Sequence, residues 1–248
     1  MKPLRAIVTG GATNIGLAIS EAFLARGGRV VVSQRQRGLP PEVAKRYGDR
    51  LIVLPVDVGQ PALCKEFIAE AAKRLGGIDV LVNNAAITGG GAVRNLAGID
   101  EAHVDSILNV NIKGVIFCSQ AAAPHLRAAG GGVIVNISSI NAFRPQRGAT
   151  VYAASKAAMT SLTQSMAKEL APDRIRVVAV APGDIRIDSS GEVEQALKAQ
   201  GAGSDVINQT PLGQGVPPDI GEVVAFLCSD AAKFVTGTTW LVDGGLLA

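Results

Sequence analysis

The sequence predicts an α/β fold: a single Rossmann-like, doubly wound domain with helices on both faces of a seven-stranded parallel sheet. Short apolar runs recur along the 248 residues, with helical segments between them. The runs are continuous, as in parallel strands buried on both faces, and the helices supply the crossovers that such strands need. No repeat or linker interrupts the chain, so we expect one domain over residues 1–248.

The first strand is expected at Leu4–Thr9, directly before the glycine-rich run TGGATNIG and an amphipathic helix. A strand, a glycine-rich turn and a helix present backbone N–H groups and a positive helix end to a pyrophosphate. The other six strands are expected at Val30–Val32, Leu51–Leu54, Val80–Val82, Val133–Ile137, Val177–Val180 and Trp240–Val242.

The stretch from Ser139 to Lys156 contains the candidate catalytic residues. Tyr152 and Lys156 are four residues apart in YAASK, so on a helix they share a face. A neighbouring ammonium favours the phenolate and lowers the tyrosine pKa, so the pair can serve as a general acid–base. Ser139 ends the apolar run VIVNIS, which would bring both hydroxyls to one carbonyl oxygen. Such a pair alone is common in ordinary helices; the serine and the glycine-rich turn favour the catalytic interpretation.

Residues 184–215 break the alternation of strands and helices. This segment follows a strand ending in APG, and it holds a short helical pattern at Glu192–Ala199 and then the run AGAGSD. Long insertions beyond the carboxyl ends of strands are usually functional lids or disordered. We expect a substrate lid, with a plain surface loop as the alternative.

Six motifs in this order resemble the short-chain dehydrogenases/reductases (SDR) of roughly this length, over essentially the whole chain. They are Thr9–Gly16, Asn83–Ala85, Asn111 in NVNIKG, the set Ser139, Tyr152 and Lys156, Pro182–Gly183, and Val242–Gly245. The resemblance implies an oxidoreductase that transfers a hydride between NADP(H) and a carbonyl or secondary alcohol.

Two positions depart from the family pattern. Asn14 replaces the second glycine of the coenzyme turn, and asparagine tolerates a left-handed backbone better than other non-glycine residues. Ala86 replaces the glycine of NNAG, which removes no chemical group. Neither change puts hydride transfer in doubt.

The resemblance also implies residue roles. Tyr152 would exchange a proton with the substrate oxygen, and Lys156 would bind the nicotinamide ribose and lower the tyrosine pKa. Ser139 would hold the carbonyl where charge develops, and Asn111 would hold a water that links Lys156 to solvent. Asp57 would bind the adenine amino group, with a helix N-cap as a further or alternative role. The full set expected at the coenzyme is Gly10, Thr13, Asn14, Ile15, Gly16, Ser33, Arg35, Asp57, Val58, Asn84, Ala85, Tyr152, Lys156, Pro182, Gly183 and Ile185.

The end of the second strand indicates the coenzyme. The chain reads VVVSQRQRG there, with Gln34 followed by Arg35 and Arg37 and no acid in the run. A fold that prefers NAD places a carboxylate here to bind the ribose hydroxyls, whereas a guanidinium binds a 2′-phosphate. We therefore expect NADP(H) rather than NAD(H), with Arg35 as the main contact and Ser33 as a second. If both arginines are only solvated, the preference is slight.

The substrate is less well indicated. A polar set lies between Ser139 and Tyr152 and in the lid: Asn141, Arg144, Gln146, Arg147, Asp184, Arg186 and Asp188. It favours a polar or anionic ketone, such as a sugar-derived ketone, a keto acid or a 3-oxoacyl thioester, unless the arginines face solvent or a subunit contact.

Two other functions are alternatives. A catalytically silent dinucleotide-binding regulator or scaffold is disfavoured by the intact catalytic set. A sugar-nucleotide epimerase of the longer related families is disfavoured because those carry a larger C-terminal domain.

The composition limits the kinds of partner that the protein is expected to bind. The net charge is +3 without a basic run, so nucleic acid is not expected. The isolated Cys64, Cys118 and Cys228 show no metal spacing and fit a reducing compartment, and no signal peptide or membrane-length run is visible. We expect a cytoplasmic protein without metal, with His103 and His125 on helix surfaces. The resemblance implies a homotetramer, built through helices at about residues 100–129 and 152–171.

Overall fold

The computed structural model describes residues 4–35, 38–188, 190–199 and 209–248. Seven strands in this part of the chain form one parallel sheet with the order β3-β2-β1-β4-β5-β6-β7. The α/β fold with a doubly wound parallel sheet is therefore confirmed, and each strand overlaps its expected run. The strands are β1 (Arg5–Val8), β2 (Arg29–Gln34), β3 (Leu51–Pro55), β4 (Val80–Asn83), β5 (Gly132–Ile137), β6 (Ile175–Pro182) and β7 (Thr239–Val242).

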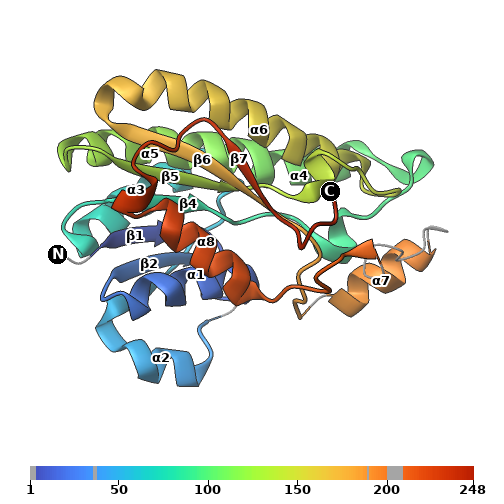
Figure 1. Ribbon diagram of the computed structural model, residues 1–248, viewed down its shortest axis with the longest axis horizontal. Helices are drawn as coiled ribbons and strands as arrows, with labels where there is room; N and C mark the ends of the chain where they lie inside the picture. Colours follow the sequence, from blue (N-terminus) through green and yellow to red (C-terminus); the bar gives the residue numbers. More distant parts are fainter. Residues whose placement is uncertain (1–3, 36–37, 189, 200–208) are drawn as a thin grey trace.

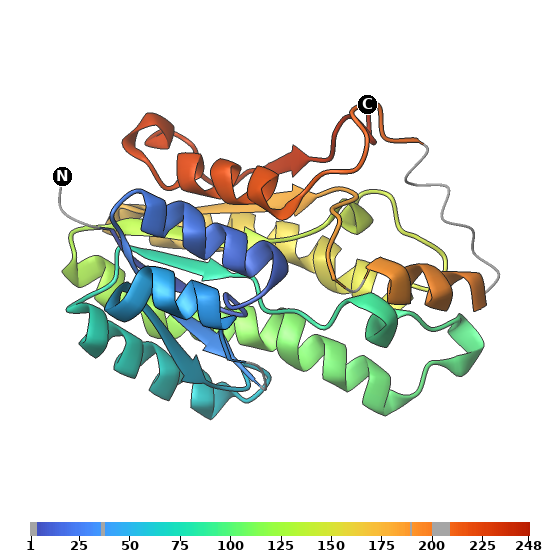
Figure 2. The same ribbon diagram turned by 90° about the horizontal axis from the view of Figure 1, so that it is seen from below.

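Helices cover both faces of the sheet. One layer contains α1 and α8, which pack against each other, and the other contains α3, α5 and α6 (Figures 1 and 2). Helix α7 lies beyond the carboxyl ends of the strands (Figure 1). The helices are α1 (Asn14–Ala25), α2 (Pro41–Tyr47), α3 (Pro61–Leu75), α4 (Glu101–Leu108), α5 (Val115–Ala128), α6 (Thr150–Leu170), α7 (Ser190–Ala199) and α8 (Pro217–Leu227).

The apolar runs are continuous because each strand packs on both layers. In β1, Ala6 and Val8 join the cluster under α1 and α8, while Ile7 joins the cluster under α3 and α5. All three side chains are fully buried. Successive residues of a strand point to opposite faces, so a sheet covered on both sides needs an apolar residue at every position.

A buried chain of polar side chains links two strands to the helices of the α3, α5 and α6 layer. Asn83 on β4 and Asn136 on β5 are register partners. The Asn83 amide donates to Ser119 Oγ at 3.0 Å and to Asn136 Oδ1 at 2.9 Å, and Asn136 Nδ2 donates to Thr163 Oγ1 at 2.9 Å. These contacts satisfy the buried amides and join α5, two strands and α6 directly beneath the carboxyl edge.

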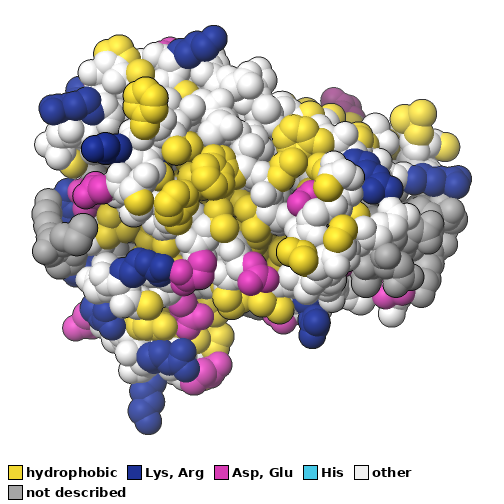
Figure 3. All heavy atoms as spheres, in the orientation of Figure 1, with side chains coloured by type: hydrophobic (Ala, Val, Ile, Leu, Met, Phe, Trp, Pro, Cys, Tyr) yellow, Lys and Arg dark blue, Asp and Glu magenta, His cyan; other side chains and the backbone are white. Residues whose placement is uncertain are grey.

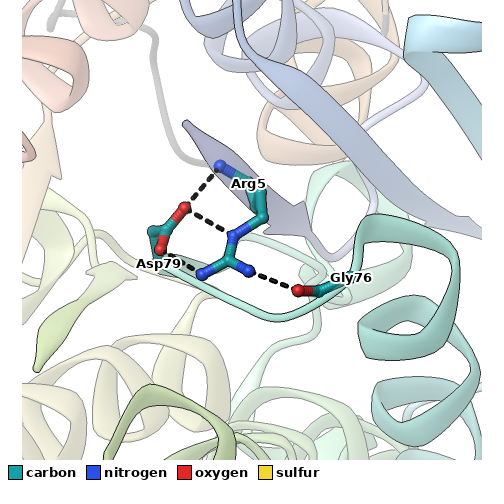
Figure 4. A network of polar contacts seen from close by, with 3 residues as sticks. All are labelled: Arg5, Gly76 and Asp79. Atoms are coloured by element: carbon teal, nitrogen blue, oxygen red, sulfur yellow. Dashed lines mark hydrogen bonds and ion pairs between the residues drawn. The ribbon is translucent and has the colours of Figure 1, made fainter. Parts of the chain in front are cut away.

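At the opposite, amino edge, a bidentate ion pair joins the starts of β1 and β4 (Figure 4). Arg5 Nε and NH2 donate to the two oxygens of Asp79 at 2.9 and 2.6 Å, and the Arg5 backbone N–H donates to the same carboxylate. Another Arg5 nitrogen donates to the Gly76 carbonyl. The hydrogen bonds that Arg5 donates to the Asp79 carboxylate raise the pKa of Arg5.

Two expectations about the helices need correction. The helix expected over residues 100–129 is interrupted by a π-helix at Asn109–Gly114, between α4 and α5. The surface position expected for His103 is wrong: its side chain is buried because α4 packs against α6, and this burial lowers its pKa. His125 is half-buried on α5.

The described residues contain neither a membrane span nor a cluster of metal ligands. None of the helices found there has the length and apolar content needed to cross a bilayer. No group of three or more histidine, cysteine, aspartate or glutamate side chains gathers there as metal ligands would.

Candidate functional site

A cavity of about 410 Å³ lies at the carboxyl edge of the sheet, where β1 sits between β2 and β4. The chain reverses its winding direction at this point, and open α/β sheets bind ligands in the crevice formed there. Every residue expected at the coenzyme lines the cavity. It is also lined by residues that sequence reasoning did not include in that set: Gln34, Val56, Ala86, Ile87, Thr88, Val110, Ile137, Ser138, Ser139 and Ile187.

The glycine-rich turn forms one wall of this cavity and is packed too tightly for larger residues. Gly10 has a left-handed φ of +62°, and a Cβ on Gly16 would lie 2.1 Å from the Gly10 carbonyl oxygen. Helix α1 begins without a side-chain cap and without an acid in its first turn. Its first N–H groups and its positive end therefore remain available to an anion, so this turn fits the pyrophosphate of a dinucleotide.

Asn14 adopts the left-handed backbone that its place in the turn requires, with φ of 48°. Asparagine thus takes the conformation that glycine has in the family pattern. Its side chain adds a contact that glycine lacks, because Oδ1 accepts a hydrogen bond from the Asp188 backbone N–H at 3.1 Å. The coenzyme turn is thereby linked to the segment after β6.

The end of β4 supports the turn from the other side. Thr9 Oγ1 accepts hydrogen bonds from the backbone N–H groups of Asn84 and Ala85, each at 3.0 Å. Asn84 Nδ2 donates to the carbonyls of Thr9 and Gly10 at 2.9 and 3.0 Å. These contacts hold β1 and β4 in register at the cavity.

The adenosine end of the cavity is bounded by Ser33, Arg35 and Asp57. Ser33 is buried, and its Oγ accepts a hydrogen bond from the Gly10 backbone N–H at 2.9 Å. Arg35 is exposed at the cavity edge, and Arg37 lies outside the described residues. Asp57 Oδ1 accepts from Gly59 N–H at 2.9 Å, and the N-cap of α3 is Gln60, so the helix-cap role considered for Asp57 is wrong.

Tyr152 and Lys156 lie one turn apart at the start of α6, and both line the cavity. The Tyr152 hydroxyl is hydrogen-bonded with Ser139, which follows β5, and with Thr88. Lys156 is 2% exposed, and its Nζ donates to the Ile137 carbonyl at 2.7 Å and lies 5.6 Å from the centre of the Tyr152 ring. The end of β5 and the start of α6 thus bring Ser139, Tyr152 and Lys156 together.

Burial controls the protonation of this pair. It lowers the pKa of Lys156 from 10.5 to about 8. It raises the pKa of Tyr152, although the hydrogen bonds with Ser139 and Thr88 act in the opposite direction. The lowered tyrosine pKa expected from the lysine is therefore wrong for the protein alone, because desolvation outweighs the effects that favour the phenolate. The hydroxyl is protonated at neutral pH and can act as an acid.

Asn111 lies behind the cavity wall, fully buried in the π-helix. Its Oδ1 accepts from Ile87 N–H at 2.8 Å, and its Nδ2 donates to the Ile87 carbonyl at 3.2 Å and to Ser155 Oγ at 3.1 Å. The side chain thus fixes the backbone next to Thr88 against α6. The water relay expected through Asn111 stays a prediction. Thr88 was missed because a single threonine in an irregular segment carries no sequence pattern.

A second cavity, of about 340 Å³, meets the first at Tyr152, Ser139 and Thr88. The segment after β6 and helix α7 form its outer wall, and α7 packs against the turn Gly89–Ala92. Of the expected polar set, Asn141, Gln146 and Asp184 line this cavity. The other four residues are exposed and line neither cavity: Arg144, Arg147, Arg186 and Asp188. For the arginines this is the alternative left open by the sequence, and for Asp188 the expected place in the pocket is wrong.

Comparisons with known proteins identify relatives of this chain. A family model described as Enoyl-(Acyl carrier protein) reductase matches residues 10–247. The chain is 35% identical to the Homo sapiens protein named Dehydrogenase/reductase SDR family member 4 over 243 residues, which are 97% of this chain and 86% of that protein. It is 37% identical over 243 residues to an uncharacterized oxidoreductase of Mycobacterium tuberculosis, covering 97% of this chain and 95% of that protein.

A solved structure has the same fold. The crystal structure of 3-ketoacyl-(acyl-carrier-protein) reductase from Brucella melitensis, complexed with NADH, matches with a TM-score of 0.87 at 30% identity. The match covers 100% of this chain and 99% of that one.

Proposed function

Because the chain belongs to the short-chain dehydrogenase/reductase family, we propose that it is an NADP(H)-dependent enzyme that reduces a polar ketone or oxidises the corresponding alcohol. Members of this family are oxidoreductases that act on carbonyl and CH–OH groups with nicotinamide dinucleotides. The observation that carries the proposal is the meeting of Tyr152 and Ser139 where the two cavities join, with Lys156 one turn along α6 in the wall of the first cavity. One cavity is lined by a pyrophosphate-binding turn, and the other offers polar side chains to a small molecule.

Each catalytic side chain has a defined task in this proposal. A bound nicotinamide dinucleotide supplies the hydride for the carbonyl carbon, or accepts it from the alcohol. Tyr152 donates its hydroxyl proton to the carbonyl oxygen in reduction and recovers it in oxidation. Ser139, which is hydrogen-bonded with that hydroxyl, donates to the same oxygen as negative charge develops. Lys156 is anchored on Ile137, and its remaining N–H groups hold ribose hydroxyls and favour proton release from Tyr152.

The coenzyme preference rests on the end of β2. Gln34 stands where NAD-preferring folds place a carboxylate, and Arg35 follows it at the open edge of the cavity. Arg35 is free to turn toward a 2′-phosphate, and Ser33 keeps a hydroxyl hydrogen to donate after accepting from Gly10. The Brucella melitensis reductase is described with NADH, so this preference belongs to the present chain and not to the fold.

The catalytic assignment is tested with Tyr152→Phe. Loss of a general acid costs about 10²–10⁴ in rate, so kcat for a panel of ketones should fall by that factor. The Kd for NADPH should stay close to that of the wild type, which separates lost chemistry from lost folding. A Phe variant with more than about half of the wild-type kcat would contradict the assignment. Coenzyme binding without turnover of any carbonyl by the wild type would instead support the catalytically silent regulator.

The coenzyme preference is tested with Arg35→Ala. A hydrogen bond to a charged group contributes about 1.5–3 kcal/mol, so kcat/KM with NADPH should fall about tenfold to a hundredfold. The value with NADH should change little, because NADH has no 2′-phosphate. Gln34→Asp should shift the preference toward NADH. A wild type that prefers NADH, or a ratio unmoved by Arg35→Ala, would overturn this part of the proposal.

The lid over residues 184–215 is also a proposal, supported by its described residues. Two contacts fasten it to the body of the fold: the Asp188 N–H donates to Asn14, and Arg144 NH2 donates to Gln209 Oε1 at 2.6 Å. Residues 189 and 200–208 lie outside the described part of the chain. Replacing residues 190–215 by a short linker should abolish turnover, whereas NADPH should still bind; full activity would show that the segment is a plain loop.

We further propose a homotetramer. Apolar side chains gather over β7 and α8 (Figure 3), including Phe226, which packs on Trp240 with ring centres 5.7 Å apart, and the exposed Leu241. This face adds to the helices α4, α5 and α6 expected from the sequence, and large apolar patches mark interaction sites. Light scattering at micromolar concentration should give four times the chain mass. A monomer mass would contradict the proposal.

A further inference from the structure

The charged groups of the second cavity are all acidic among its described lining residues. Asp184 lies directly after β6, and Glu194 lies on α7; no lysine or arginine is among these residues. The three arginines expected to receive an anionic substrate are exposed and line neither cavity. Among these described residues, a substrate carboxylate or phosphate would therefore meet the like charge of Asp184.

Asp184 is held in a defined position. Its backbone carbonyl accepts from the Gly215 N–H at 2.9 Å, and its two carboxylate oxygens accept from Gln214 Nε2 at 3.2 Å each. Gln214 is fixed in turn, because its Oε1 accepts from Arg186 Nε at 3.2 Å. A carboxylate can accept about four hydrogen bonds, so Asp184 retains acceptor sites for a ligand in the cavity.

The rest of the cavity wall is divided between polar and apolar groups. Amide side chains of Asn141, Gln146 and Gln214 line it together with the two acids. Apolar side chains line it as well: Ala92, Val93, Ile140, Ala149, Ile185 and Ile187. Asn141 is fixed, since its Oδ1 accepts from Gln146 N–H at 3.0 Å. Amides and carboxylates together accept hydrogen bonds from hydroxyl groups and need no charge on the ligand.

We propose that the second cavity selects an uncharged, hydroxyl-bearing ketone or its polyol, with Asp184 as the specificity-determining residue that accepts hydrogen bonds from substrate hydroxyls. This inference rests on the proposed function, and it separates the three substrate types considered above. Sugar-derived ketones fit, keto acids are repelled by Asp184, and simple 3-oxoacyl thioesters offer no hydroxyl group to its open acceptor sites. Like charges placed together repel each other strongly, so the discrimination should be large.

The test uses pairs of substrates that share a carbon skeleton and differ in charge. Hydroxyacetone is compared with pyruvate, fructose with fructose phosphate, and an acetoacetyl thioester is assayed beside them with NADPH. The neutral member of each pair should have the higher kcat/KM, by about tenfold or more. A higher value for pyruvate, for fructose phosphate or for the thioester would overturn the inference and leave the oxidoreductase assignment intact. Failure to reduce any carbonyl would instead refute the proposed function.

Single substitutions test whether the Asp184 carboxylate causes the discrimination between neutral and anionic substrates. Asp184→Asn keeps the size and removes the charge, so the ratio of kcat/KM between the neutral and anionic members should fall about tenfold. Asp188→Asn is the matched control on the same segment, because its exposed side chain lines neither cavity. It should leave the ratio unchanged, and an equal fall in both variants would overturn the role of Asp184.

A binding measurement excludes effects on the chemical step. In the Tyr152→Phe background loaded with NADPH, isothermal titration should rank fructose above fructose phosphate, and Asp184→Asn should reduce that difference. Equal affinities for the two sugars in this background would overturn the inference.

Discussion

The buried ammonium of Lys156 should make the stability of the protein rise with pH in the alkaline range. Its side chain is 2% exposed, and burial lowers its pKa from 10.5 to about 8. Between these two values the unfolded chain binds more protons than the folded chain, so the free energy of unfolding increases with pH. The full difference corresponds to about 3 kcal/mol, of which about 2–3 kcal/mol falls between about pH 7 and about pH 10.

Lys156→Met removes this titration and keeps a long side chain in the same space. Both proteins are unfolded in urea without coenzyme, at a series of pH values, and the free energies of unfolding are subtracted. Titrating groups that lie far from Lys156 cancel in the difference. The wild type should gain about 2–3 kcal/mol relative to the variant as the pH rises through about 8 and toward 10.5.

Tyr152 is the main source of interference, because its ring centre lies 5.6 Å from Lys156 Nζ and burial raises its pKa. The comparison is therefore repeated in a Tyr152→Phe background, where the same gain is expected. A difference that stays flat, or that falls with pH, would refute the claim that the Lys156 ammonium is destabilised by burial.

Three further outcomes are expected. Asp79→Asn removes the charge that Arg5 binds, so urea denaturation should show a loss of about 1–3 kcal/mol with kcat unchanged; a changed kcat would contradict a purely structural role. Gly16→Ala would place a methyl group 2.1 Å from the Gly10 carbonyl oxygen, so fluorescence titration should give an NADPH Kd raised about tenfold or more, and a wild-type Kd would count against the turn as the pyrophosphate site. Asn136→Leu leaves its buried partners on β4 and α6 unpaired, so calorimetry should show Tm lowered by roughly 4–10 °C; an unchanged Tm would be inconsistent with this.

The sheet and the coenzyme cavity could be predicted because their signals are local. Each buried strand is a continuous apolar run, and the turn from Thr9 to Gly16 has its glycines where close packing requires them. The left-handed backbone of Asn14 followed from the conformational preference of asparagine and is confirmed.

The second cavity could not be predicted in the same way, because loop side chains carry no periodicity that indicates their direction. Arg144 and Asn141 are three residues apart in one loop, yet Asn141 lines the cavity and Arg144 is exposed. The π-helix at Asn109–Gly114 was missed for a related reason. A single widened turn leaves the helical pattern on either side of it intact.

The ion pair between Arg5 and Asp79 has a consequence for how such a protein can diverge. It joins β1 and β4 at the amino edge of the sheet. The residues that line the second cavity lie on loops and on α7 at the opposite edge. A mutation in one of those loops can change the substrate specificity while the ion pair that aligns the two strands stays intact. The match to the Brucella melitensis reductase shows how much the sequence can change while the fold is kept, since the TM-score is 0.87 at 30% identity. New substrate specificities can therefore arise through changes in single loops while the sheet keeps its structure.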